Sequence, residues 1–138
     1  MRQMGEIVRK QKPLIMGPKD TVKHACEHMR DRRFGAVLVA DGTGRLLGIF
    51  TGRDAVCRVL AEAKDAARLT LGEVMTRDPE TLPPGKSAVE ALRMMRDGGY
   101  RHLPVVEGDK ILGIVSKGDF RGIEQDRLDE ETGIWERI

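Results

Sequence analysis

The sequence contains itself twice, and this duplication constrains the fold more than any other feature. When the first half is shifted by 66 residues, with a one-residue gap opposite Gly44, residues 8–54 lie over residues 74–119. Thirteen aligned positions are identical, including Pro18/Pro84, Met29/Met95, Gly48/Gly113 and Asp54/Asp119. A repeat of this length is one supersecondary unit that shares a core with its neighbour. The 138 residues therefore predict two copies of one small fold.

The composition limits the partners and the cellular compartment that we expect for this chain. The 24 Lys and Arg nearly balance the 22 Asp and Glu, so charge gives no reason to expect a nucleic-acid or acidic-membrane partner. No apolar run approaches the ~20 residues of a membrane span, and the first residues carry no apolar signal segment. Only two cysteines, Cys26 and Cys57, are present, which fits a reducing compartment. We expect a cytoplasmic protein.

Both repeats show the same local order of an extended segment, a helix, two apolar strands and a second helix. Proline after each extended segment favours extended backbone before it, and glycine-containing turns between the apolar runs predict hairpins. The expected segments are 14–16, a helix from Thr21, strands 36–40 and 46–50 and a helix near Gly52, then 81–82, a helix from Ser87, strands 103–106 and 111–115 and a helix near Lys117.

Capping patterns and apolar faces define the remaining helices. Ser87 with Glu90 and Thr70 with Glu73 match the capping box, in which each side chain bonds the other residue's backbone N–H. Met4, Ile7 and Val8 predict a short N-terminal helix with one apolar face. The tail 125–138 is charged but retains Trp135, and we expect it to be helical.

One motif occurs in both repeats where a buried strand ends and a helix begins. It reads Gly48-Ile-Phe-Thr51-Gly-Arg-Asp54 in the first copy and Gly113-Ile-Val-Ser116-Lys-Gly-Asp119 in the second. Glycine permits a close approach to the strand, the helix start offers free N–H groups to an anion, and the carboxylate can accept bonds from ribose hydroxyls. The motif indicates a nucleotide site. The same spacing also suits a helix cap, so this second interpretation stays open.

The repeat resembles the CBS domain, and the whole chain resembles a tandem CBS pair, or Bateman module. The resemblance is carried by Pro18-x-x-Thr21, by Tyr100-Arg-His-Leu-Pro-Val-Val106 and by the two motifs above. It implies an α+β fold with two β-α-β-β-α repeats, 8–66 and 70–124, packed through their sheets with pseudo-twofold symmetry. It also implies clefts between the repeats that bind AMP, ADP, ATP, NAD(H) or S-adenosylmethionine, and a homodimer.

The resemblance assigns roles position by position. Asp54 and Asp119 match the ribose-binding aspartate, and Thr51 and Ser116 match the hydroxyl that contacts ribose or phosphate. Arg101 and His102 match positions that meet phosphates, and the first repeat lacks them, which predicts unequal clefts. The remaining expected ligand contacts are Ile15 and Thr81 near the adenine and Phe34 and Tyr100 as wall residues.

Other candidates are weaker. His24 and His28 have the i, i+4 spacing that can hold a metal, but the apolar stripe places them on the polar face and no carboxylate completes a site. We therefore expect a solvated face and no metal. No Ser-His-Asp, Cys-His or paired-carboxylate arrangement predicts catalysis, so we expect a non-enzyme.

These observations predict a regulatory module that senses energy or redox state through an adenine nucleotide, AMP above all, and changes conformation on binding. An unidentified regulated protein is its expected partner. The alternative is a dimerisation or scaffold module whose clefts are vestigial and whose two motifs act only as caps.

Overall fold

The computed structural model describes residues 2–120, and these residues form two compact units. The first-repeat unit comprises residues 12–79 with 108–111. The second-repeat unit contains, of the described residues, 2–11, 80–107 and 112–120. The predicted repeats, 8–66 and 70–124, follow the duplication along the chain, whereas the units divide it differently at both repeat starts. The tail 125–138 lies outside the described residues.

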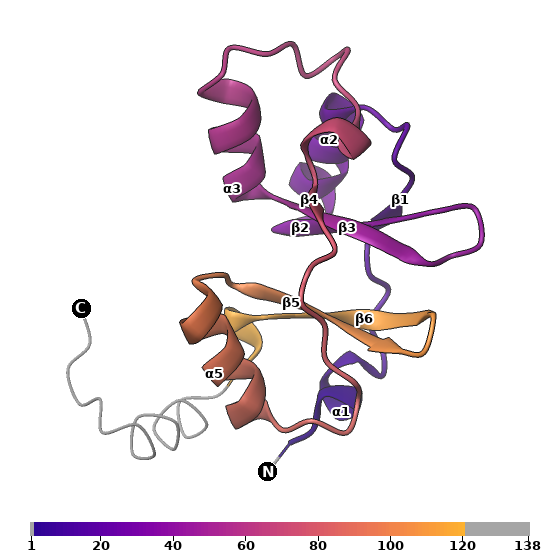
Figure 1. Cartoon of the computed structure of the whole chain (residues 1–138), viewed down its shortest axis with the longest axis vertical. Coiled ribbons are helices and arrows are strands. Elements are labelled where there is room, and N and C mark those ends of the chain that lie inside the picture. Colours follow the sequence, from indigo (N-terminus) through magenta and orange to yellow (C-terminus); the bar gives the residue numbers. More distant parts are fainter. Residues whose placement is uncertain (1, 121–138) are drawn as a thin grey trace, which may run out of the picture. The chain divides into compact units, whose positions relative to one another are not determined.

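The first-repeat unit is a four-stranded sheet with helices on one face (Figure 1). Strand β1 runs parallel to β2, while β2–β3 and β3–β4 are antiparallel. Every residue of β2 is buried, as its unbroken apolar run predicts. Helix α2 and the helical turns after β3 cover the core face. The elements are β1 (Ile15–Met16), α2 (Val22–Arg32), β2 (Ala36–Ala40), β3 (Leu46–Thr51), α3 (Gly52–Asp54), the π-helical turn η1 (Ala55–Leu60), α4 (Leu71–Val74) and β4 (Thr76–Arg77).

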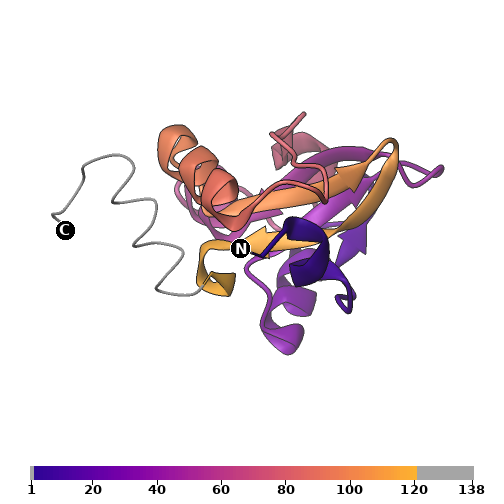
Figure 2. The ribbon, with the colours of Figure 1, turned by 90° about the horizontal axis from the view of Figure 1, so that it is seen from below.

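The second-repeat unit is an antiparallel hairpin packed against helices α1 and α5 (Figure 2). Its elements are α1 (Met4–Val8), α5 (Ala88–Gly98), β5 (His102–Glu107), β6 (Lys110–Ser116) and the 3-10 turn η2 (Lys117–Asp119). The extended segment expected over 81–82 pairs with β5 in parallel through the single bridge Leu82–Val105, and it is too short to form a strand. The two prolines that follow Leu82 lack N–H groups and cannot extend the ladder. The α5 cap is also simpler than predicted, because Glu90 pairs with Lys86 instead of reaching back to Ser87.

The segment that leads into each repeat packs with the opposite repeat. Gly5 N donates to the carbonyl of Pro84 at 2.9 Å, and Gly72 N donates equivalently to Pro18 at 2.9 Å. Helix α1 thereby fills the second-repeat core with Met4, and helix α4 fills the first-repeat core with Leu71; both side chains are fully buried. This exchange explains why the units do not coincide with the sequence repeats: each core is completed by a helix that precedes the other copy.

Candidate ligand-binding site

The first motif forms the helix cap that its spacing allows. Strand β3 ends at Thr51 and α3 begins at Gly52. The backbone N–H of Thr51 donates to Oδ2 of Asp54 at 2.9 Å, and the N–H of Asp54 donates to Oγ1 of Thr51 at 3.3 Å. The Thr51 hydroxyl also lies 3.2 Å from Oδ2. One carboxylate oxygen is thus committed to the cap.

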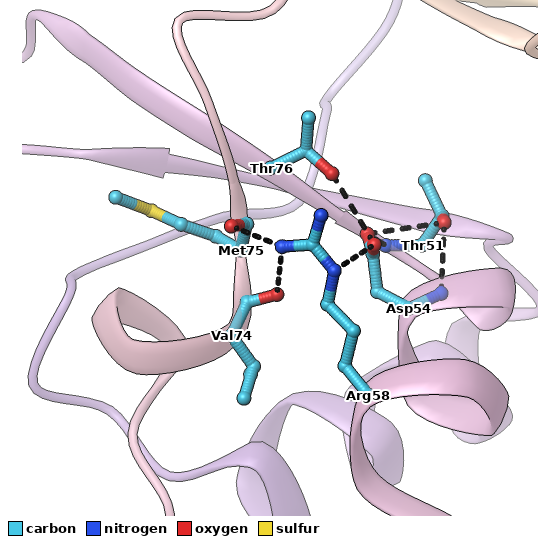
Figure 3. Close-up of polar contacts among 6 residues, drawn as sticks. All are labelled: Thr51, Asp54, Arg58, Val74, Met75 and Thr76. Atoms are coloured by element: carbon cyan, nitrogen blue, oxygen red, sulfur yellow. Dashed lines mark hydrogen bonds and ion pairs between the residues drawn. The ribbon is translucent and has the colours of Figure 1, made fainter. Parts of the chain in front are cut away.

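The other oxygen of Asp54 is committed to the segment before the second repeat (Figure 3). Thr76 Oγ1 donates to Oδ1 at 3.2 Å, and Nε of Arg58 lies 3.6 Å from the same atom. Arg58 Nη1 donates in turn to the carbonyls of Val74, at 3.2 Å, and Met75, at 2.9 Å. Asp54 is only 8% exposed. A ribose hydroxyl would have to displace these contacts to reach it.

The second motif repeats the cap but leaves its carboxylate open. Ser116 N donates to Oδ2 of Asp119 at 2.7 Å, and the Ser116 hydroxyl lies 3.2 Å from the same oxygen. Asp119 is exposed. Arg2 Nη2 donates to the backbone carbonyl of Asp119 at 3.0 Å, and the cap engages Oδ2 of its side chain. The duplicated sequence places Lys10 at the position of Thr76 and Ile123 at that of Arg58.

Two basic residues at the start of β5 lie beside this open carboxylate. Lys117 N donates to the carbonyl of Arg101 at 2.9 Å, which joins β5 to the motif. Burial, and then the positive charge of Arg101, lower the pKa of His102, while the negative charge of Asp119 opposes them. The structure therefore gathers Arg101, His102, Ser116 and Asp119 in one unit. This cluster presents exposed cationic and anionic groups, a half-buried imidazole and a hydroxyl.

The aromatic residue before each central strand differs in surroundings. Tyr100 is partly buried, and burial together with the nearby carboxylate of Glu80 raises its pKa to about 12. Phe34, 38% exposed, carries the guanidinium of Arg32 over its ring, 4.7 Å from the centroid. A ligand stacking on that face of Phe34 would have to displace the arginine.

The expected adenine contacts point away from the cores. Ile15 on β1 is 45% exposed between buried Leu14 and Met16, and Thr81 is exposed beside buried Leu82. Ile15 and Phe34 belong to the first-repeat unit, with Thr51 and Asp54. Thr81 and Tyr100 belong to the second-repeat unit, with the open carboxylate.

Each motif glycine lies in close contact with another segment of the protein's own chain. A Cβ on Gly48 would lie 2.7 Å from the carbonyl oxygen of Thr76, and one on Gly113 would lie 2.7 Å from Cβ of Val8. The motif glycines therefore do permit a close approach, but the group that approaches is an exchanged segment of the chain and not a ligand.

The sequence analysis did not identify Arg58 and Thr76 as partners of Asp54. The i, i+4 spacing of Asp54 and Arg58 could have indicated the ion pair, whereas Thr76 lies 22 residues away and carries no local signal.

Two duplicated α+β units, each with a strand-to-helix hydroxyl–carboxylate motif, define the class of the protein as a tandem-repeat module. The CBS domain model matches residues 4–60 and 71–125, so the chain belongs to the CBS-domain family. In the described part of the chain, no helix combines the length and hydropathy needed to cross a membrane.

Individual relatives agree with this family. The chain is 38% identical over 108 residues to the CBS domain-containing protein CBSCBSPB2 of Arabidopsis thaliana, covering 78% of this chain and 20% of that protein. It spans about a fifth of the length of this relative and of two similar Arabidopsis thaliana proteins, CBSCBSPB1 and CBSCBSPB3. The CBS-domain containing protein ATU1752 from Agrobacterium tumefaciens is 26% identical, with a TM-score of 0.79 over 91% of this chain and 98% of that one. CBS domain protein PAE2072 from Pyrobaculum aerophilum, solved in complex with AMP, shares the fold at 20% identity, with a TM-score of 0.81 over 93% and 98% of the two chains.

Proposed function

We propose that this CBS pair is a regulatory module that binds an adenine nucleotide through its second repeat. The observation that carries the proposal is the contrast between the two motif carboxylates. Asp54 is enclosed by Arg58 and Thr76, whereas Asp119 is exposed and, within residues 2–120, its cap engages only Oδ2. An ionised carboxylate with a free oxygen accepts charge-assisted hydrogen bonds from a pair of ribose hydroxyls.

The neighbouring side chains suit the rest of a nucleotide. Arg101 supplies a permanent positive charge for phosphate, and His102 supplies an imidazole that becomes positive when an anion raises its pKa. Ser116 adds a hydroxyl next to Asp119. The AMP complex of PAE2072 supports an adenosine ligand for this fold. AMP is our first choice because the first repeat lacks the Arg-His pair and a single cationic pair favours one small phosphate group.

A second function is favoured by a separate observation. Both motifs are complete capping boxes, and in the first one the carboxylate binds Thr51, Thr76 and Arg58, all of which are structural contacts. A scaffold module would need nothing more than these caps.

Under the regulatory proposal, ligand binding shifts the population of conformations by its differential affinity for them. Homodimerisation, a regulated partner protein and a cytoplasmic location stay predictions of the sequence.

A thermal-shift screen of the purified chain against AMP, ADP, ATP, NAD, NADH and S-adenosylmethionine tests the proposal. A ligand at 100 times its dissociation constant should stabilise the fold by about 2.7 kcal/mol, which is a shift of several degrees. Stabilisation that Asp119→Ala removes supports the site in the second repeat. Silence with every ligand at millimolar concentration favours the scaffold.

A further inference from the structure

Helix α2 carries a pair of histidines that the nucleotide proposal does not use. Nε2 of His24 and Nε2 of His28 face each other at 3.0 Å, with ring centroids 4.6 Å apart and the planes tilted by 43°. His24 is exposed and His28 is half-buried. Two neutral imidazoles at this distance share one N–H···N hydrogen bond. The same atoms are also the ones through which histidine binds a metal ion.

The distance between the two nitrogens fits one shared ion. Zinc–nitrogen bonds of about 2.0–2.1 Å place two ligand nitrogens about 2.9 Å apart at a right angle and about 3.4 Å apart at a tetrahedral angle. The observed 3.0 Å lies within this interval. One histidine would carry its proton on Nδ1 instead of Nε2, which leaves both Nε2 lone pairs free to bind the ion.

The backbone beneath the pair is fixed before any ion arrives. Thr21 caps α2 by accepting the N–H of His24 at 3.1 Å, and Val22 and Ala25 anchor the helix in the core. The two histidines are one turn apart on this anchored frame. Chelation therefore costs little ordering, which favours two-point binding over binding by one imidazole.

Among residues 2–120, no third protein ligand joins the pair. Cys26 packs against the core, where burial raises the pKa of its thiol, and Asp31 is engaged by Arg30 Nε at 2.8 Å. Within the described residues, no three His, Cys, Asp or Glu side chains gather around one point. The sequence argument against a metal depended on this missing carboxylate. Water can occupy the remaining positions because His24 faces solvent.

We propose that His24 and His28 form a two-histidine chelating site for a divalent late transition-metal ion on the exposed face of α2. Imidazole nitrogen suits Zn²⁺, Ni²⁺ and Cu²⁺, whereas Mg²⁺ and Ca²⁺ prefer oxygen. The site is independent of Asp119 and of any nucleotide, so each proposal can fail without the other.

Calorimetric titration of the full chain with Zn²⁺ and with Ni²⁺ tests the site, using His24→Gln and His28→Gln. One ion per chain is expected, and either variant should weaken binding by about tenfold or more because chelation is lost. A matched control is the double variant Lys23→His with His24→Gln, which keeps two histidines on α2 but five residues apart. It should behave like the single variants.

Other results would overturn the proposal. These are no binding by the wild-type chain at millimolar ion, unchanged affinity in either single variant, or wild-type affinity in the spacing control. Because both rings lie on the polar face, the variants should fold, which circular dichroism checks. A second readout is the ¹⁵N spectrum of the imidazoles, in which Nε2 of both histidines should shift on adding Zn²⁺ and return on adding EDTA, while His102 should not.

Discussion

Arg58 and Asp54 form an ion pair that ties the helix after the first motif to the segment leading into the second repeat. Nε of Arg58 lies 3.6 Å from Oδ1 of Asp54, and Nη1 holds the carbonyls of Val74 and Met75. The carboxylate is nearly buried, while the arginine side chain is 49% exposed. The pair is therefore more than a surface salt bridge, although solvent screens part of it.

Replacing Arg58 by Ala should lower the free energy of unfolding by about 1–2 kcal/mol, because two carbonyls lose a donor and a nearly buried carboxylate loses its ion-pair partner. Chemical denaturation of the full chain measures the loss. Arg68→Ala is the matched control, since Arg68 is 90% exposed and pairs with Asp65 at 3.7 Å. That control should change stability by less than about 0.5 kcal/mol. Equal effects of the two variants would contradict the role given to Arg58.

Substitution of Asp54 should mainly reduce the stability of the fold, whereas substitution of Asp119 should mainly reduce nucleotide affinity. Asp54→Ala removes a cap, the ion-pair partner of Arg58 and the acceptor of the Thr76 hydroxyl, so it should destabilise the fold by about 2–3 kcal/mol. Asp119→Ala removes only an exposed cap and should cost about 1 kcal/mol. For the nucleotide that the screen identifies, Asp119→Ala should weaken binding about tenfold to a hundredfold.

Paired measurements of denaturation and of nucleotide affinity by calorimetry check this division. Asp109→Ala, in the exposed turn of the second hairpin, is the control and should leave both quantities nearly unchanged. Loss of affinity in Asp54→Ala with none in Asp119→Ala would reverse the assignment of the site.

The sequence predicted what depends on local pattern. The strand-to-helix caps at Thr51 and Ser116, the Thr70 capping box and the helix over Met4–Val8 are all present. The duplication gave the fold because it fixes element order without any long-range contact. Exchange of the leading segments was not predictable, since Met4 has the same apolar pattern whichever core receives it. The closure of Asp54 was missed for the same reason, because Thr76 reaches it only in the folded chain.

The pKa of His102 should depend on both of its charged neighbours, Arg101 and Asp119. Arg101 lowers its pKa and Asp119 raises it, so Arg101→Gln should raise that pKa and Asp119→Asn should lower it. A folded-state pKa below the unfolded value means that the unfolded chain binds more protons as pH falls below about 6.5. The contribution of His102 to stability is therefore fully present above that pH and is lost as pH falls toward the folded pKa.

NMR titration of the His102 ring in the wild-type chain, in Arg101→Gln and in Asp119→Asn measures these pKa shifts directly. Nucleotide phosphate bound nearby should raise the same pKa, because an anion favours the imidazolium. Identical His102 titrations in wild type and Arg101→Gln would exclude the proposed cluster.

Truncating a buried side chain of α1 or α4 should destabilise the core of the repeat that the helix does not precede. Met4 precedes the first repeat but is fully buried in the core of the second, and Leu71 precedes the second repeat but is fully buried in the core of the first. Truncating either side chain to Ala should cost about 2–5 kcal/mol through lost burial and a residual cavity. Hydrogen exchange locates the effect. Met4→Ala should deprotect the amides of β5 and β6 before those of β2 and β3, and Leu71→Ala should do the opposite. Since the two variants serve as controls for each other, deprotection that follows the sequence repeats instead would show that the helices are not exchanged in solution.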